Sequence, residues 1–171
     1  MEANFSPECR YENCLKSSLA LRLVKILPEI IQADQYAYIK GRTIFDAIPT
    51  IDDIMEYTKI QQLSGLMVAV DFEKAFDSLS WSFLFRALRS FNLGESFIRW
   101  VSVLYCNVCS CVLNNNFSSQ LFDVRRGVRQ GDPLSAYLFI IALEVLLVKI
   151  GSVSMVSSLI KKSSLQLLPM I

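Results

Sequence analysis

A carboxylate directly follows a short apolar run in the middle of the sequence. Residues 66–70 read Leu-Met-Val-Ala-Val, and Asp71 and Phe72 come next. A run of this length favours a buried strand, which would place Asp71 at the edge of a sheet. A carboxylate in that position can bind a hard cation such as Mg²⁺. The alternative is that Asp71 only caps a following helix, with Glu73 near the positive end of the helix dipole.

A second stretch, residues 125–135, reads Arg-Arg-Gly-Val-Arg-Gln-Gly-Asp-Pro-Leu-Ser. Its cations are Arg125, Arg126 and Arg129. Asp132 is a favoured helix N-cap and Pro133 suits the first helical turn, so this junction exposes backbone N–H groups. Gly131 lets another backbone approach, and the arginines supply charge for phosphates or bases. The alternative is an ordinary capped helix start with solvated arginines.

Two cations flank a glycine upstream of both stretches. Lys40, Gly41 and Arg42 follow residues 35–39, where the helical period of the preceding segment is lost. Gly41 is expected to be a turn residue, and the two side chains beside it can close on a triphosphate. A solvated loop is the alternative.

Length and composition indicate one globular domain, because 171 residues with 53% hydrophobic and 19% charged residues can bury a sizeable core. The net charge of +1 gives no bulk attraction to nucleic acid or membrane, so any polyanion site must be local. Five cysteines indicate reduced thiols in an intracellular protein of the cytoplasm or nucleus, not a secreted one. Histidine is absent, which excludes His-based triads and His-containing zinc sites.

Hydrophobic periodicity predicts a mostly helical chain with one hairpin. Residues 1–14 show no period and are expected to be an irregular lead-in. Alternation over residues 108–113 and 117–124 predicts a β-hairpin, and Pro28 is expected to kink or split the first helix. The last helix is nearly all apolar but shorter than a bilayer requires, which favours a buried core helix and no membrane span. The expected helices lie at residues 15–31, 43–62, 80–91, 97–105 and 134–150.

Three of these segments together resemble reverse transcriptases of the non-LTR, LINE type. Residues 70–78, Val-Asp-Phe-Glu-Lys-Ala-Phe-Asp-Ser, resemble the first catalytic motif of that family. Residues 126–135 resemble its second palm motif, and residues 35–42 resemble the fingers motif that lies upstream. The order and separation of the three also agree, and the resemblance runs from about Lys16 to Ile150.

The resemblance implies an α/β (α+β) fold, namely part of a right-hand polymerase palm with an antiparallel sheet backed by helices. Part of the fingers accompanies it, and the thumb is absent. The partial fingers and palm domain would cover residues 15–150, between the lead-in at residues 1–14 and a divergent tail at residues 151–171. The oligomeric state is left open.

The resemblance also assigns roles to single residues. It makes Asp71 the catalytic ligand of two Mg²⁺ ions and gives the Phe72 backbone carbonyl to one of them, for attack of a primer 3′-hydroxyl on a triphosphate. The implied partners are an RNA template, a DNA primer and deoxynucleoside triphosphates. Phe76 matches the aromatic residue that excludes a ribose 2′-hydroxyl. The nucleotide-binding positions are Lys40, Arg42, Phe76, Gln130 and Gly131, and the nucleic-acid-binding positions are Arg125, Arg126 and Arg129.

One departure from the family pattern bears on activity. Family members place an aromatic-Ala-Asp-Asp turn after the helix that ends near Ile150, and residues 151–171 contain no Asp or Glu. The resemblance therefore implies a fragment of an RNA-directed DNA polymerase that is inactive as given, so its status as an enzyme stays open. The alternative is a non-catalytic mobile-element remnant with weak nucleic-acid binding. A primer-extension assay distinguishes the two.

Overall fold

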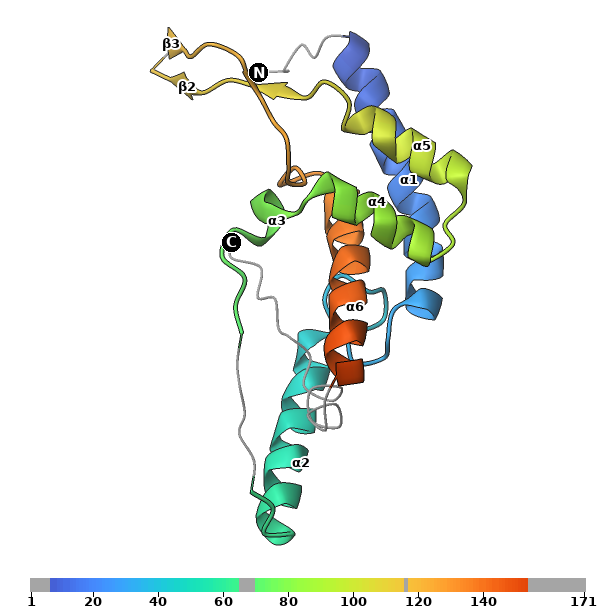
Figure 1. Cartoon of the computed structure of the whole chain (residues 1–171), viewed down its shortest axis with the longest axis vertical. Helices are drawn as coiled ribbons and strands as arrows, with labels where there is room; N and C mark the ends of the chain where they lie inside the picture. Colours follow the sequence, from blue (N-terminus) through green and yellow to red (C-terminus); the bar gives the residue numbers. More distant parts are fainter. Residues whose placement is uncertain (1–6, 65–69, 116, 154–171) are drawn as a thin grey trace. The chain divides into compact units, whose positions relative to one another are not determined.

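The computed structural model describes residues 7–64, 70–115 and 117–153 (Figure 1). Contacts between residues divide the chain into two units. Unit 1 comprises Met1–Leu21 and Lys74–Ala142, and unit 2 comprises Arg22–Glu73 and Leu143–Ile171.

Helices and short antiparallel strands make up the described part of the chain, which confirms a mixed α and β composition. The helices are α1 (Pro7–Ile30), the 3-10 helix η1 (Ile44–Asp46), α2 (Ala47–Ile60), α3 (Ala75–Ser78), α4 (Trp81–Ser90), α5 (Glu95–Leu104) and α6 (Ser135–Val153). The strands are β1 (Cys109–Ser110), β2 (Leu113–Asn114), β3 (Phe117–Ser118) and β4 (Phe122–Asp123).

Helix α1 begins earlier than the sequence pattern indicated. Residues 7–14 are helical, so the expected irregular lead-in over residues 1–14 is wrong for this part. Proline is well tolerated in a first helical turn, where its missing N–H has no partner to lose, and Glu12 forms an i,i+4 ion pair with Lys16 at 2.7 Å. Pro28 lies near the end of α1 and does not split it.

Unit 1 contains the contacting helices α4 and α5, whose apolar residues recur at helical spacing. The buried side chains are Leu84, Ala87 and Leu88 on α4, and Phe97, Ile98, Val101 and Leu104 on α5. The start of α6 adds Leu138, Ile140 and Ile141, each 0% exposed. Fully burying one such side chain contributes about 1.5–3 kcal/mol. The expected buried core helix is therefore confirmed.

The hairpin of unit 1 runs out to a tip formed by β2 and β3 (Figure 1). Its antiparallel ladders pair Cys109 with Asp123 and Leu113 with Ser118, which confirms the expected hairpin. The ladders are only two residues long. Because both faces are exposed, with Phe117 81% exposed, no buried face favours longer pairing. Cys109 in β1 is a free cysteine and is exposed as well.

In unit 2, a loop joins the end of α1 to η1 and α2. Its buried apolar side chains are Leu23, Leu27, Ile31, Ile39, Ala47 and Leu143. Glu144 is also buried, at 1% exposure, and its carboxylate accepts the backbone N–H of Gln32 at 3.2 Å. The strand expected at residues 66–70 falls largely outside the described residues.

A search of the described helices found none with the length and hydropathy needed to span a membrane.

Glu144 makes stability depend on pH. Burial raises the pKa of Glu144 above its usual 4.5, and the hydrogen bond from the backbone of Gln32 partly offsets this rise. The charge of Asp34 raises the pKa further, and the charge of Arg42 lowers it. The folded protein therefore holds this proton more tightly than the unfolded chain does. The stabilising contribution is fully present below pH 4.5 and is lost as the pH rises through the raised folded pKa.

We expect the free energy of unfolding of the natural chain to fall relative to that of Glu144→Gln as the pH rises from about 4.5, the ordinary Glu value, to 8. Urea unfolding at stepped pH measures the difference. Glu56→Gln, at an exposed position of α2, is the matched control. Parallel curves for Glu144→Gln and the natural chain would contradict a raised pKa.

Candidate nucleotide and nucleic-acid site

Asp71 lies in unit 2 and, with Phe72, outside any helix or strand. Its side chain is exposed, and its Oδ1 accepts the N–H of Phe72 at 2.9 Å. The alternative role as a helix N-cap is wrong, because α3 begins at Ala75 and its N-cap is Lys74. Asp71 thus presents a carboxylate at the surface with one local hydrogen bond. Its role as a metal ligand stays a prediction.

Phe76 lies in α3 of unit 1 and is half-buried. Its ring stacks on Phe139 of α6, with ring centroids 5.0 Å apart and planes inclined by 15°. Such a pair contributes about 0.5–1.5 kcal/mol beyond the area that it buries. Because Phe139 is only 7% exposed, it is a fixed surface against which the Phe76 ring is held.

Backbone hydrogen bonds join the first motif to the second within unit 1. The N–H of Gly127 donates to the Leu79 carbonyl at 2.7 Å, and the N–H of Val128 donates to the Phe76 carbonyl at 2.8 Å. The indole N–H of Trp81 donates to the Gly127 carbonyl at 2.7 Å. Both backbone groups of Gly127 are therefore bound to the segment that follows Phe76.

The same junction explains why residue 127 is a glycine. Its φ is +89°, a value that side-chain-bearing residues rarely adopt. A Cβ added here would lie 3.0 Å from both the Cα and the carbonyl oxygen of Asp77. Because residue 127 is a glycine, the backbone adopts this φ without strain and no side chain separates the two motif segments.

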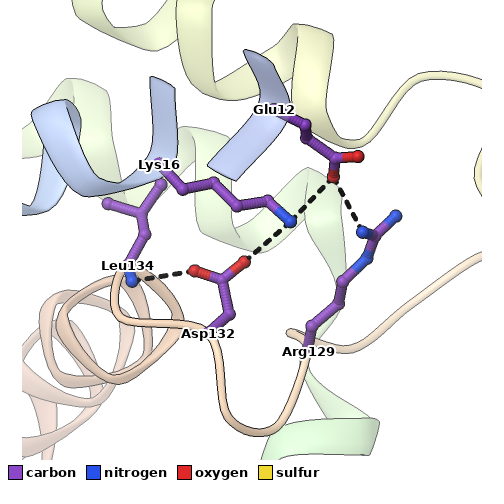
Figure 2. A network of polar contacts seen from close by, with 5 residues as sticks. All are labelled: Glu12, Lys16, Arg129, Asp132 and Leu134. Carbon is purple, nitrogen blue, oxygen red and sulfur yellow. Dashed lines mark hydrogen bonds and ion pairs between the residues drawn. The ribbon is translucent and has the colours of Figure 1, made fainter. Parts of the chain in front are cut away.

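A network of charges holds the second motif to α1 (Figure 2). The Glu12 carboxylate lies 2.7 Å from Lys16 Nζ and 2.7 Å from Arg129. Lys16 also contacts Asp132 at 3.0 Å, and the other Asp132 oxygen accepts the N–H of Leu134 at 2.9 Å. Helix α6 begins only at Ser135, so Asp132 lies in the turn ahead of the helix and is not the predicted N-cap residue. The hydrogen bond from Lys16 lowers the pKa of Glu12; burial opposes this and Arg129 adds to it.

Tyr105 packs beside this network. Its ring lies 5.3 Å from that of Trp81 and 6.5 Å from that of Phe85. Burial raises the pKa of Tyr105 to about 12, the charge of Asp132 adds to the rise, and the Ser135 hydroxyl opposes it. The phenol therefore stays neutral at physiological pH and serves packing.

Arg125 and Arg126, the other two cations of residues 125–135, are exposed. Arg125 pairs with Asp123 at 3.9 Å, but both side chains are largely solvated, so the pair contributes little. Arg126 is exposed too. Gln130 and Gly131 are exposed, and the space within 4 Å of the Gly131 Cβ position is open. These residues are accessible to a ligand, and their binding roles stay predictions.

Arg42 has a structural role that the sequence did not reveal. Its guanidinium donates to the backbone carbonyls of Pro28, Ile31, Gln32 and Gln35. These carbonyls lie at and just beyond the end of α1, where such groups need a donor. Lys40 is exposed, and Gly41 has φ +81°, which confirms the expected turn. Triphosphate binding by this loop stays a prediction.

The predicted residues fall into the two units. Unit 1 contains Phe76, Arg125, Arg126, Arg129, Gln130 and Gly131, and unit 2 contains Lys40, Arg42, Asp71 and Phe72. Sequence reasoning missed Glu12, Lys16, Trp81 and Phe139. The four-residue spacing of Glu12 and Lys16 was a usable signal, but only with the start of α1 known. Trp81 and Phe139 could not be distinguished from ordinary core residues.

The described residues do not fit a pair of Mg²⁺ ions on their own. Within residues 7–64, 70–115 and 117–153, no group of three or more Asp, Glu, Cys or His side chains lies close enough to bind a metal ion. Mg²⁺ requires near-octahedral oxygen coordination. The Asp71 carboxylate and the Phe72 carbonyl would supply only part of it.

Residues 10–158 match the family described as reverse transcriptase (RNA-dependent DNA polymerase). The chain therefore belongs to the reverse transcriptase family, and its resemblance to the non-LTR retrotransposon type is confirmed.

The relatives come from mobile elements. The chain is 34% identical to the Transposon TX1 uncharacterized 149 kDa protein of Xenopus laevis over 128 residues. The aligned region is 74% of this chain and 10% of that protein. It is 31% identical over 102 residues to a retrovirus-related Pol polyprotein from the type-2 retrotransposable element R2DM of Drosophila melanogaster. This aligned region is 60% of this chain and 10% of that polyprotein. A retrovirus-related Pol polyprotein from the type-1 retrotransposable element R2 of Popillia japonica is 30% identical over 98 residues. This aligned region is 56% of this chain and 16% of that polyprotein. The chain thus spans only 10% to 16% of the length of these relatives.

Gly127→Ala is expected to lower the free energy of unfolding more than Gly131→Ala does. Both glycines have a positive φ, so alanine costs about 1–2 kcal/mol at each. Only at residue 127 does the new methyl group also meet the Asp77 backbone at 3.0 Å. Urea unfolding measures both variants, and equal losses would contradict a tight junction between the two motifs.

Proposed function

We propose that this chain carries part of the fingers and palm of an RNA-directed DNA polymerase. The supporting observation is the direct backbone pairing of its two motif segments, Phe76 with Val128 and Leu79 with Gly127. This pairing keeps the aromatic residue of the first motif and the turn of the second motif in one unit. A polymerase needs both, because sugar selection and base-pair checking act on the same incoming nucleotide.

The candidate site residues of unit 1 each have a role in this proposal. Phe76, supported by Phe139, excludes a ribose 2′-hydroxyl by its bulk. Gln130 and Gly131 line the nascent base pair from the exposed turn. The arginines of the second motif contact phosphates of an RNA template and a DNA primer, which fixes the register of the duplex without reading sequence.

In unit 2, Lys40 and Arg42 have different roles in a triphosphate-binding loop. Lys40 is exposed and contacts the phosphates. Arg42 donates to four backbone carbonyls, so it contributes by holding the loop that presents Lys40.

A complete site would take two Mg²⁺ ions, with the Asp71 carboxylate and the Phe72 carbonyl among the ligands. The described residues supply no further cluster of ligands, which supports an incomplete catalytic centre. The same observation favours the second candidate, a non-catalytic remnant that binds nucleic acid weakly. In either case we propose an intracellular location, where templates and nucleotides are present.

The chain purified as given is expected to show no primer extension with Mg²⁺ or Mn²⁺. One carboxylate and one carbonyl under-coordinate a metal pair, and charge stabilisation dominates phosphoryl transfer. A labelled DNA primer on an RNA template measures incorporation. Template-dependent incorporation that Asp71→Asn abolishes would contradict the proposed inactivity and support a competent polymerase.

Binding of the same primer–template is expected to be weak and strongly salt-dependent, because it acts through phosphates. Replacing the three arginines of the second motif by Gln should weaken binding and reduce the slope of log Kd against log salt by about 2–3. Fluorescence anisotropy between low and high salt measures both quantities.

The matched control for this experiment removes the same charge elsewhere. It replaces by Gln three exposed arginines of the helices, Arg22, Arg86 and Arg99. The control should keep most of the affinity at every salt concentration, apart from a small uniform loss. If the two triple variants lose the same slope, the second motif is not the nucleic-acid interface.

A further inference from the structure

A buried cation lies between α1 and the second motif (Figure 2). The Lys16 side chain is only 8% exposed, and its Nζ lies 2.7 Å from Glu12 and 3.0 Å from Asp132. Lysine is seldom this buried unless it is paired. A buried ammonium group needs partners for its charge and its protons, and the two carboxylates supply them.

Asp132 is fixed from two directions. One carboxylate oxygen binds Lys16, and the other accepts the N–H of Leu134 just before α6 begins. Its side chain is 10% exposed, so solvent screens the contact with Lys16 little. The end of the turn formed by residues 129–132 is therefore tied to α1 as well as to α6.

The beginning of this 129–132 turn is tied to α1 as well. Arg129 contacts Glu12 at 2.7 Å, and Glu12 in turn contacts Lys16. Gln130 and Gly131, between the two anchors, are exposed. The position of these two residues thus depends on the anchors at residues 129 and 132, and Lys16 links the two.

We propose that Lys16 is a positioning residue for the nucleotide site. By binding Glu12 and Asp132 together, it holds the 129–132 turn in the conformation that presents Gln130 and Gly131 to the nascent base pair. This inference rests on the function proposed above for the turn. Lys16 is too buried to bind nucleic acid itself and acts only through the turn.

Two variants of the full chain separate positioning from charge compensation. Lys16→Met keeps the unbranched stem and removes the cation between Glu12 and Asp132, so Asp132 loses its counter-charge while Glu12 keeps Arg129. Lys16→Met combined with Asp132→Asn removes the uncompensated charge and keeps an acceptor for the Leu134 N–H, because the asparagine side-chain oxygen can accept the same hydrogen bond. Lys25→Met, at an exposed position of α1, is the matched control.

The probe is a fluorescein-labelled DNA primer annealed to an RNA template, with the deoxynucleoside triphosphate complementary to the next template base present so that a nascent base pair can form. Lys16→Met should be less stable to urea because it loses both ion pairs, and it should bind about tenfold more weakly because the turn is no longer held in its binding conformation. The double variant should recover stability but not affinity, because the link from α1 to residue 132 is still missing and only the contact between Glu12 and Arg129 remains. Lys25→Met should change neither by a comparable amount. Affinity that returns together with stability would overturn the proposal.

Hydrogen exchange without any ligand tests the same proposal independently. The peptide spanning residues 125–134 should exchange faster in the double variant, whose restored stability excludes global unfolding, than in Lys25→Met. Equal exchange in these two variants would overturn the positioning role. If the unsubstituted chain fails to bind the primer–template, the proposed function fails, and the exchange result still decides the role of Lys16.

Discussion

The approach of the backbone at residue 127 to the segment after Phe76 is the constraint on which the rest of unit 1 depends. Three hydrogen bonds of 2.7–2.8 Å cross this junction, two of them between backbones. Each is worth about 0.5–1.5 kcal/mol in net stability, but an unpaired buried N–H or C=O would cost more. Gly127 is buried, so water cannot replace these hydrogen bonds. Without them, its N–H and C=O would have no partner.

Electrostatics in unit 1 are local, as the small net charge of the sequence required. Arg129 and Lys16 share Glu12, and Lys16 also shares Asp132, so these cations are compensated within the fold. Arg126 is exposed. The basic character of residues 125–135 is therefore smaller than the three arginines suggest, because Arg129 pairs with Glu12 and Arg125 lies near Asp123.

Periodic apolar residues predicted most of the fold. Leu84 and Leu88, four residues apart, marked α4, and Asp132 before a proline marked the start of α6. Ser80 is the N-cap residue of α4, but its hydroxyl pairs with that of Ser82 and does not cap the helix. The first turns of α1 escaped prediction because they show no apolar period, and one of their stabilising contacts is the tertiary ion pair between Glu12 and Arg129, which periodicity does not record.

The candidate site was predictable only where a residue type is tied to backbone geometry or to a family motif. Gly41 could be recognised as a turn residue because its positive φ favours glycine. The stacking of Phe139 on Phe76 and the burial of Lys16 arise from residues distant in the sequence, and no local pattern indicates them. The strand expected before Asp71 lies largely outside the described residues.

The contacts of Arg42 affect how substitutions in its loop should be interpreted. Its partners are neutral carbonyls that the planar guanidinium reaches together, and a lysine ammonium has fewer donors and no such fork. Arg42→Lys is therefore a drastic change here, although it preserves the charge. A mutational scan that measures only nucleotide affinity would count Arg42 as a phosphate ligand. The measured loss would instead come from the release of the loop from the end of α1, which Arg42 holds through its backbone contacts.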